Sequence, residues 1–180
     1  MSWYEINPNH TITDMSVNWC TDCIQSEDAP CHRACILGSN LMAYIDGMET
    51  KGYLNALFFY CNLSGSAVQV HYRCDGPDIR RGFEMNIERR ASGVVRASHD
   101  LLWTDKGNSI VSLASEDQIC RCSQCLRHKL GKEWHEGYFA ANIPDDSLRY
   151  VICPDCREAA NGALMGGVIP FSAANSGRIN

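Results

Sequence analysis

Apolar residues recur at helical spacing in the first quarter of the chain. A helix is expected to begin near Asp28, whose side chain can cap it, and Pro30 suits the first turn because proline has no N–H to leave unpaired. Gly47 and Gly52 are the expected stops. The apolar stripe of this helix is formed by Leu37, Leu41, Tyr44, Ile45 and Met48.

The centre of the chain shows the shorter period of β-strands. Val68, Val70 and Tyr72 alternate with polar residues, which places one face of this strand in a core and the other in water. Two further segments alternate in the same way, and the first predicted strand is mostly apolar, as a buried strand is. The pattern predicts an antiparallel meander of five strands over residues 52–63, 68–74, 83–88, 95–103 and 110–114.

Length and composition indicate a soluble globular protein. The 180 residues are 45% apolar and 21% charged. No apolar run approaches the roughly 20 residues that a membrane-spanning helix requires, and the N-terminus lacks the basic and apolar parts of a signal peptide. We therefore expect an intracellular, cytoplasmic protein in a reducing environment, without a membrane partner.

Cysteine is the residue type that carries the clearest chemistry. There are 11 cysteines, an odd number, and several form C-x-x-C pairs, which in a reducing compartment favours metal over disulfides. Cys122 and Cys125 are separated by 27 residues from Cys153 and Cys156, enough to close a tetrahedral zinc site with four thiolates. Cys120 is an alternative ligand, because in an extended segment it faces the same way as Cys122.

The second of these pairs lies where a strand over residues 148–152 is expected to meet a helix. Pro154 fits the first turn of that helix, and the positive end of the helix dipole favours thiolate over thiol. A C-x-x-C knuckle, a hairpin and a C-x-x-C at a helix start resemble the treble-clef and zinc-ribbon modules. The resemblance covers residues 118–165, about a quarter of the chain. It implies a structural zinc, in modules that bind DNA, RNA or protein or only hold a fold together.

A second cysteine cluster lies near the N-terminus. Two of its cysteines are four residues apart, on one face of the expected helix start, and His32 is an alternative to the first of them. The expected ligands are Cys20, Cys23, Cys31 and Cys35, so that the chain binds about two Zn²⁺ ions. Reduced core cysteines and an iron–sulfur cluster are the alternatives. A zinc deaminase is disfavoured, because the spacing is one residue too long and no H-x-E lies upstream.

Four cysteine ligands leave no open position on a zinc ion, so we assign no catalytic residues and expect no enzyme. The segment of residues 133–136 contains two acids and a histidine, but we interpret it as a solvated finger loop with Trp134 packed on the module. A zinc-dependent enzyme is the third hypothesis.

The formal net charge of −5 argues against a strong non-specific hold on nucleic acid. Two local basic groups are nevertheless candidates for contact with nucleic acid or a protein partner, unless they only offset nearby negative charge. The first comprises Arg121, Arg127, His128, Lys129 and Lys132, and the second comprises Arg80, Arg81, Arg89, Arg90 and Arg96. A polar sheet face with Gln69, His71, Arg73, Glu84, Asn86 and Glu88 is an equally good docking surface for a protein.

Together these patterns predict an α+β fold with a central five-stranded antiparallel meander flanked by two zinc-stabilised modules with short helices. Residues 1–50 would form a zinc-clamped helix module, 51–116 the sheet, 117–165 the treble-clef-like module, and 166–180 a tail. The favoured function is a non-catalytic adaptor, regulator or inhibitor that docks on a protein or nucleoprotein partner. A phage or mobile-element product that blocks a host machine would suit such a chain. DNA or RNA binding through residues 121–132 is the alternative.

Overall fold

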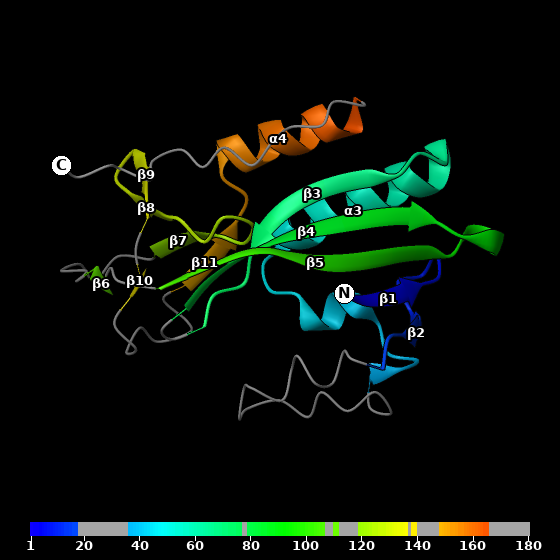
Figure 1. Cartoon of the computed structure of the whole chain (residues 1–180). Coiled ribbons are helices and arrows are strands. Elements are labelled where there is room, and N and C mark those ends of the chain that lie inside the picture. Colours follow the sequence, from blue (N-terminus) through cyan, green and yellow to red (C-terminus); the bar gives the residue numbers. More distant parts are fainter. Residues whose placement is uncertain are drawn as a thin grey trace.

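The computed structural model describes residues 1–17, 36–76, 79–106, 110–111, 119–136, 138–139 and 148–165. Its largest element is an antiparallel sheet of five strands in the order β2-β1-β5-β4-β3 (Figure 1). These strands are β1 (Ser2–Ile6), β2 (Ile12–Met15), β3 (Val68–Arg73), β4 (Ile79–Arg89) and β5 (Val95–Lys106). The predicted α+β class with a five-stranded antiparallel sheet is therefore confirmed.

The strands of this sheet are only partly those predicted. β3, β4 and β5 follow the alternating segments, and the turn between β4 and β5 lies at Ala91–Gly93, where Ser92 and Gly93 take positive φ angles of 58° and 76°. The other two strands come from the N-terminus, where no strand was predicted. β1 pairs with β5 from Ser2 opposite His99 to Ile6 opposite Val95.

The prediction of a strand over residues 52–63 is wrong, because this segment lies in the helix α3 (Met48–Ser64). Gly47 precedes the helix as its N-cap with φ of 80°, and Gly65 ends it in the left-handed conformation. Leu57, Phe58 and Cys61 are buried, but Phe59 and Leu63 on the opposite side are exposed. A helix that is apolar on both sides has no helical period in its hydrophobicity, and this explains the error.

The predicted helix from Asp28 to about Met48 is wrong in the part that the structure describes. Residues 41–44 form only a short 3₁₀ turn, η1 (Leu41–Tyr44), which Asn40 caps by accepting a 2.8 Å hydrogen bond from the N–H of Met42. Gly47 does separate two elements, as predicted, whereas Gly52 lies inside α3 and stops nothing. Residues 28–35 lie outside the described part of the chain.

A second sheet positions the C-terminal cysteine pairs: the first pair begins at Cys122, the last residue of β7, and the second pair follows the end of β11. Its order is β11-β7-β8-β9, with β11 parallel to β7 and the other pairs antiparallel. The strands are β7 (Ile119–Cys122), β8 (His128–Leu130), β9 (Glu133–His135) and β11 (Leu148–Val151), and the helix α4 (Pro154–Leu164) follows. Two short strands, β6 (Ile110–Val111) and β10 (Tyr138–Phe139), pair with each other in parallel. Residues 110–111 were predicted to belong to the meander, and this is wrong.

The main core lies between the central sheet and its helices. α3 runs behind β3 and β4 in Figure 1, and α4 packs against β3. Ile6, Val68 and Ile87 of the sheet and Leu57 of α3 are at most 2% exposed, and Ala160 of α4 belongs to the same cluster. Neither of the two described α-helices is long and apolar enough to cross a bilayer.

Candidate metal centre

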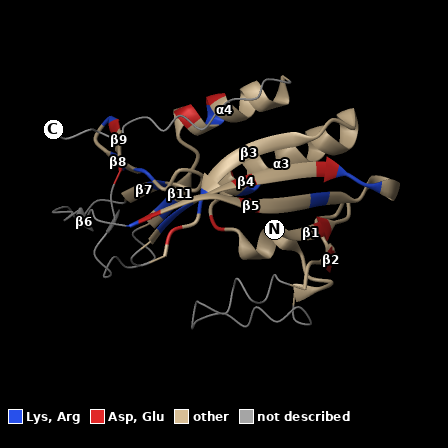
Figure 2. Ribbon diagram, viewed as in Figure 1, with Lys and Arg blue, Asp and Glu red and all other residues tan. Residues whose placement is uncertain are grey.

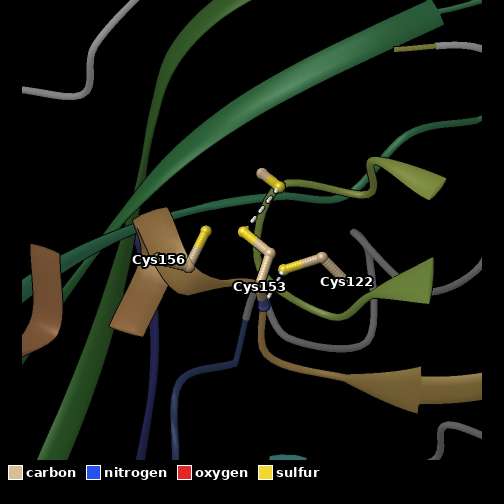
Figure 3. A group of neighbouring side chains, drawn as sticks. Cys122, Cys153 and Cys156 are labelled. Carbon is tan, nitrogen blue, oxygen red and sulfur yellow. Dashed lines mark hydrogen bonds between the residues drawn. The ribbon is translucent and has the colours of Figure 1, made fainter. Parts of the chain in front are cut away.

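The two C-terminal cysteine pairs meet in space. The sulfur atoms of Cys122, Cys125, Cys153 and Cys156 all lie within 4.8 Å of one another. Figure 3 shows the side chains of Cys122 and Cys153 converging with that of Cys156, which comes from the first turn of α4. The prediction that these four residues gather at one site is therefore confirmed, and the group is consistent with a zinc-binding module.

The first pair is held by a tight knuckle between β7 and β8. The N–H of Leu126 donates a 2.9 Å hydrogen bond to the carbonyl of Cys122, and the N–H of Cys122 donates a 2.8 Å bond to the carbonyl of Arg127. Leu126 takes a positive φ of 60°, which lets the chain reverse directly after Cys125. Both sulfurs are thereby presented on one side of the turn.

The second pair is placed by the start of α4. Cys153 is the N-cap residue and Pro154 occupies the first turn, as predicted, so that Cys156 follows one turn later on the same side. The N–H of Cys153 donates to the sulfur of Cys122 at 3.4 Å. The positive end of the helix dipole lies at this point and stabilises thiolates.

The spacing of the sulfurs fits a tetrahedral metal ion. Zinc–thiolate bonds of about 2.3 Å place two sulfurs of a tetrahedron roughly 3.8 Å apart. The sulfurs of Cys125 and Cys153 are separated by 3.7 Å, far more than the roughly 2.05 Å of a disulfide. Four sulfur donors are also the ligand set that zinc prefers in closed sites. One group of four cysteines can therefore hold one metal ion, and zinc is compatible with it.

Arg127 supplies positive charge next to the sulfurs. Its Nε donates to the sulfur of Cys125 at 3.3 Å, and one Nη donates to the sulfur of Cys153 at 3.6 Å and to the carboxylate of Asp155 at 2.6 Å. Hydrogen bonds from the neighbouring thiols, with Cys122 contributing most, and from Arg127 hold the pKa of Cys125 well below its usual range. The sulfur of Cys125 is therefore prepared to carry negative charge, whereas hydrogen bonds with the neighbouring cysteines raise the pKa of Cys122 and Cys156.

The group is closed to solvent on most sides. Cys122 and Cys153 have no exposed surface and Cys125 is 6% exposed. Trp134 of β9 packs against the cluster, in agreement with the prediction that it covers the module. Tyr53 of α3 also lies close to it: burial, and then the proximity of Cys156, raises the pKa of the Tyr53 hydroxyl.

A buried ion-pair network joins the knuckle to the central sheet. The guanidinium of Arg73, at the end of β3, donates to the carbonyl of Cys125 at 3.1 Å and forms ion pairs with Asp75 and Glu136. The side chains of Arg73 and Asp75 are only 4% and 2% exposed. Arg73 therefore belongs to the support of the metal site, and the prediction that it lies on an open polar face is wrong.

The other predicted ligands are not part of this group. Cys120 is half-buried on β7 and is not among the four cysteines whose sulfurs lie within 4.8 Å. The second cluster, with Cys20, Cys23, Cys31, Cys35 and the alternative His32, lies outside the described residues. The second zinc ion stays a prediction.

The basic residues proposed for partner binding fall into separate places. Arg80 and Arg81 lie near one end of β4, whereas Arg89 is the last residue of the strand and Arg90 follows it (Figure 2). A strand rises about 3.3 Å per residue, so Arg80 and Arg89 are about 30 Å apart. Arg96 is the second residue of β5, opposite Glu88 near the Arg89 end of β4, and it forms an ion pair with Glu5 at 2.7 Å.

The basic residues predicted at the knuckle also differ in how accessible they are to a partner. His128 is 2% exposed, which excludes direct contact of its ring with a large partner, and burial together with Arg121 and Arg73 lowers its pKa to about 3. Arg127 is engaged by the cysteines and Asp155. Lys129 and Lys132 are exposed.

Glu136, one of the acids in the segment of residues 133–136, accepts from Arg73 and from Arg80. Glu136 therefore takes part in an ion-pair network that connects β3 and β4 to the segment of residues 133–136.

Comparisons of the chain with protein-family models, with curated proteins and with solved structures found no match in any of the three. Function is therefore inferred from the chemistry of the described site and surfaces.

The sequence patterns did not indicate Arg73, Asp75 or Tyr53 as residues of this site. Arg73 occupies a polar position of an alternating strand, and nothing in its neighbours distinguishes a buried arginine from an exposed one. Tyr53 lies in the segment whose secondary structure was predicted wrongly.

Proposed function

We propose that this protein is a non-catalytic binding protein, an adaptor, regulator or inhibitor, whose fold is stabilised by a closed zinc–tetrathiolate site. The observation that supports this most directly is the burial of the converging sulfurs: three of the four cysteines are at most 6% exposed. A catalytic zinc keeps one coordination position for water or substrate, and four cysteine ligands occupy all of them.

The zinc ion would replace a hydrophobic core in the C-terminal part of the chain. Apart from the cysteines themselves, the hydrophobic cluster at the site includes only Trp134 among the described residues, and the strands beside it add the buried side chains of Ile119, Val151 and Ile152. Such a small apolar cluster cannot offset the entropy of ordering a module of this size, whereas binding of a structural zinc supplies folding free energy directly. A knuckle followed by a hairpin and a cysteine-capped helix supports the assignment of this module to the treble-clef type.

The polar face of the central sheet is the proposed docking surface for a protein partner. Gln69 is exposed, and Glu84 and Glu88 are partly exposed on the side of the sheet opposite to the buried apolar residues. His71 and Glu84, which are cross-strand neighbours, are joined at 3.1 Å, so part of this surface is held in a fixed arrangement. A rigid surface of mixed polarity can bind a protein without a large cost in side-chain entropy.

Cobalt substitution tests whether the site is closed. The chain should bind Co²⁺ with the absorption of a tetrahedral thiolate complex, and excess azide or thiocyanate should leave that spectrum unchanged, since no position is open. A spectral change on addition of the anion, saturating at one anion per metal, would show an open position and contradict the non-catalytic assignment.

Docking is tested by affinity capture with paired variants. A partner recovered at one-to-one stoichiometry by the natural chain should be lost by a Gln69→Arg/Glu84→Lys variant and retained by a Lys129→Glu/Lys132→Glu variant. Retention of the partner by the first variant would contradict the assignment of this face.

Nucleic-acid binding is the second candidate, and one arrangement favours it. Lys129 is the cross-strand neighbour of Trp134, and the same row continues through Cys120 to Arg149, which is exposed. Basic side chains next to an aromatic ring are typical of surfaces that bind single-stranded nucleic acid.

A further inference from the structure

The side of the central sheet that faces away from α3 carries most of the net negative charge of the chain. The apolar cluster that includes Leu57 of α3 and Ala160 of α4 lies on the other side, so neither described α-helix covers this one (Figure 1). The strand register sets its side chains in three rows, here called the acidic face, with five carboxylates and one arginine in a chain whose net charge is −5. The rows are Asp14, Glu5, Arg96 and Glu88; Trp3, Ser98, Asn86 and Gln69; and Asp100, Glu84 and His71.

Two pairs of carboxylates on the acidic face lie directly opposite each other on neighbouring strands. Glu84 is the cross-strand neighbour of Asp100, and Glu5 is the neighbour of Asp14. Like charges in such positions destabilise a sheet. Part of the charge is offset within the chain, by the contacts Glu5–Arg96 at 2.7 Å, Glu84–His71 at 3.1 Å and Glu88–Arg90 at 3.4 Å. The remaining repulsion lowers the stability of the isolated chain, and positive charge from a partner would offset it.

Two of the four tryptophans lie on this side of the sheet as well. Trp3 belongs to the middle row, and the guanidinium of Arg96 lies 4.0 Å from the centre of its ring. Trp103 packs against Gly82, its neighbour on β4, so closely that a Cβ atom added to Gly82 would lie 2.2 Å from the indole. Both tryptophans are partly exposed. Tryptophan is among the residues that contribute most to binding at protein interfaces.

We propose that the acidic face binds a basic segment of a protein partner, rich in arginine and lysine. This inference rests on the proposed docking function and adds the chemistry of the partner. Guanidinium and ammonium groups are attracted both by carboxylates and by the faces of tryptophan rings, and this side of the sheet offers both. The contact of Arg96 with Trp3 and Glu5 is an example of this chemistry within the chain. A polyanion such as nucleic acid is repelled by the same carboxylates.

Fluorescence anisotropy with a labelled nona-arginine peptide and the full zinc-loaded chain tests the proposal. The natural chain should bind the peptide, and its affinity should fall as the salt concentration rises, because salt screens exposed charges. Glu84→Gln/Asp100→Asn should weaken binding about 5-fold or more, since two carboxylates that face the peptide are lost. Glu133→Gln/Glu158→Gln makes the same change of charge at exposed positions outside the acidic face, and it should leave the affinity within about 2-fold of the natural value.

The melting temperature separates binding from folding in this experiment. Glu84→Gln/Asp100→Asn removes a pair of like charges, so it should keep or raise the melting temperature while it weakens binding of the peptide. Equal affinities of the two double variants, or no binding of the peptide by the natural chain at low salt, would overturn the proposal. Weaker binding that accompanies a lower melting temperature would overturn it as well, because the carboxylates would then act through the fold.

Affinity capture with Gln69→Arg/Glu84→Lys tests the docking function itself, and the two can fail separately. A partner that this variant loses, but whose contact segment has no excess of arginine and lysine, would overturn the inference about charge and leave the docking function intact. A partner that the variant retains would contradict the docking function, whatever the result with the peptide.

Discussion

Arg73 donates a hydrogen bond of 3.1 Å from its guanidinium to the main-chain oxygen of Cys125, and its own main-chain N–H donates to the carbonyl of Gln124 at 2.6 Å. These two contacts fix the end of β3 to the knuckle that carries the first cysteine pair. On the other side of the knuckle, the hydroxyls of Thr50 in α3 and Ser123 are 2.6 Å apart. The metal site and the central sheet are thereby parts of one unit.

Removal of Arg73 should be strongly destabilising. Arg73→Met leaves the Asp75 carboxylate buried without its partner, and breaking such a buried pair costs about 3–5 kcal/mol of unfolding free energy. Chemical denaturation of the zinc-loaded chain measures this. Arg90→Met, which removes an exposed ion pair to Glu88, should cost at most about 1 kcal/mol. Equal losses in the two variants would contradict a special role for Arg73.

Arg127 should matter for metal affinity more than for folding. Its guanidinium contacts the sulfurs of Cys125 and Cys153, and loss of such a supporting group typically weakens metal binding about 10–100-fold. We expect the Arg127→Met variant to release zinc to a chromogenic chelator at a chelator concentration about 10–100-fold lower than the natural chain requires. Lys129→Met, on the same hairpin but exposed, is the matched control and should behave as the natural chain. An unchanged chelator titration for Arg127→Met would argue against its contact with thiolate.

His99 should make the fold sensitive to acid. It is packed between Tyr4 and Tyr72, and burial lowers its pKa to about 4 from the ordinary value of 6.5. Between these values the unfolded chain binds a proton that the folded chain does not, so stability falls as the pH decreases from 6.5 to 4. From pH 7 to pH 5 this amounts to roughly 1–2 kcal/mol.

The comparison with His99→Gln isolates this effect, because acid release of zinc is common to both chains. The variant should lose less unfolding free energy than the natural chain between pH 7 and pH 5. Identical pH profiles for the two proteins would show that His99 does not contribute.

Nucleic-acid binding, if present, should depend on the zinc hairpin. Lys129→Glu/Lys132→Glu should weaken binding of a single-stranded oligonucleotide at low salt and flatten its salt dependence, because two phosphate contacts are removed. Arg89→Glu/Arg90→Glu makes the same charge change at the distant end of β4 and serves as control. An affinity that is equal in both double variants, or no binding to any oligonucleotide by the natural chain at low salt, would remove this candidate.

The parts that the sequence predicts correctly are those with a strong local signal. The two cysteines of each C-x-x-C motif lie within four residues of chain, so the local backbone alone brings their sulfur atoms together. Pro154 likewise marks the start of the helix that positions Cys156. The alternation of Val68, Gln69 and Val70 reports directly which side chains face the core, because successive residues of a strand point to opposite sides.

The errors arise where long-range contacts decide the structure. α3 carries Phe58 towards the core and Phe59 towards solvent, so its composition resembles a buried strand, and the exposed apolar face hides the helical period. β1 is specified by pairing with β5, some ninety residues later in the chain, and short segments do not reveal such pairing. The burial of Arg73 is likewise set by Cys125 and Glu136, which no local pattern links to it.

The melting transition of the chain with and without metal tests the central claim most directly. Complete removal of metal should lower the melting temperature and broaden the transition, and stoichiometric zinc should restore both. Cys153→Ala should bind one zinc ion fewer per chain by elemental analysis and should fail to recover the natural melting temperature, whereas Cys74→Ala, at an exposed cysteine outside the site, should recover it fully. A metal-free chain that keeps the same melting temperature and the same cooperative transition would contradict the account.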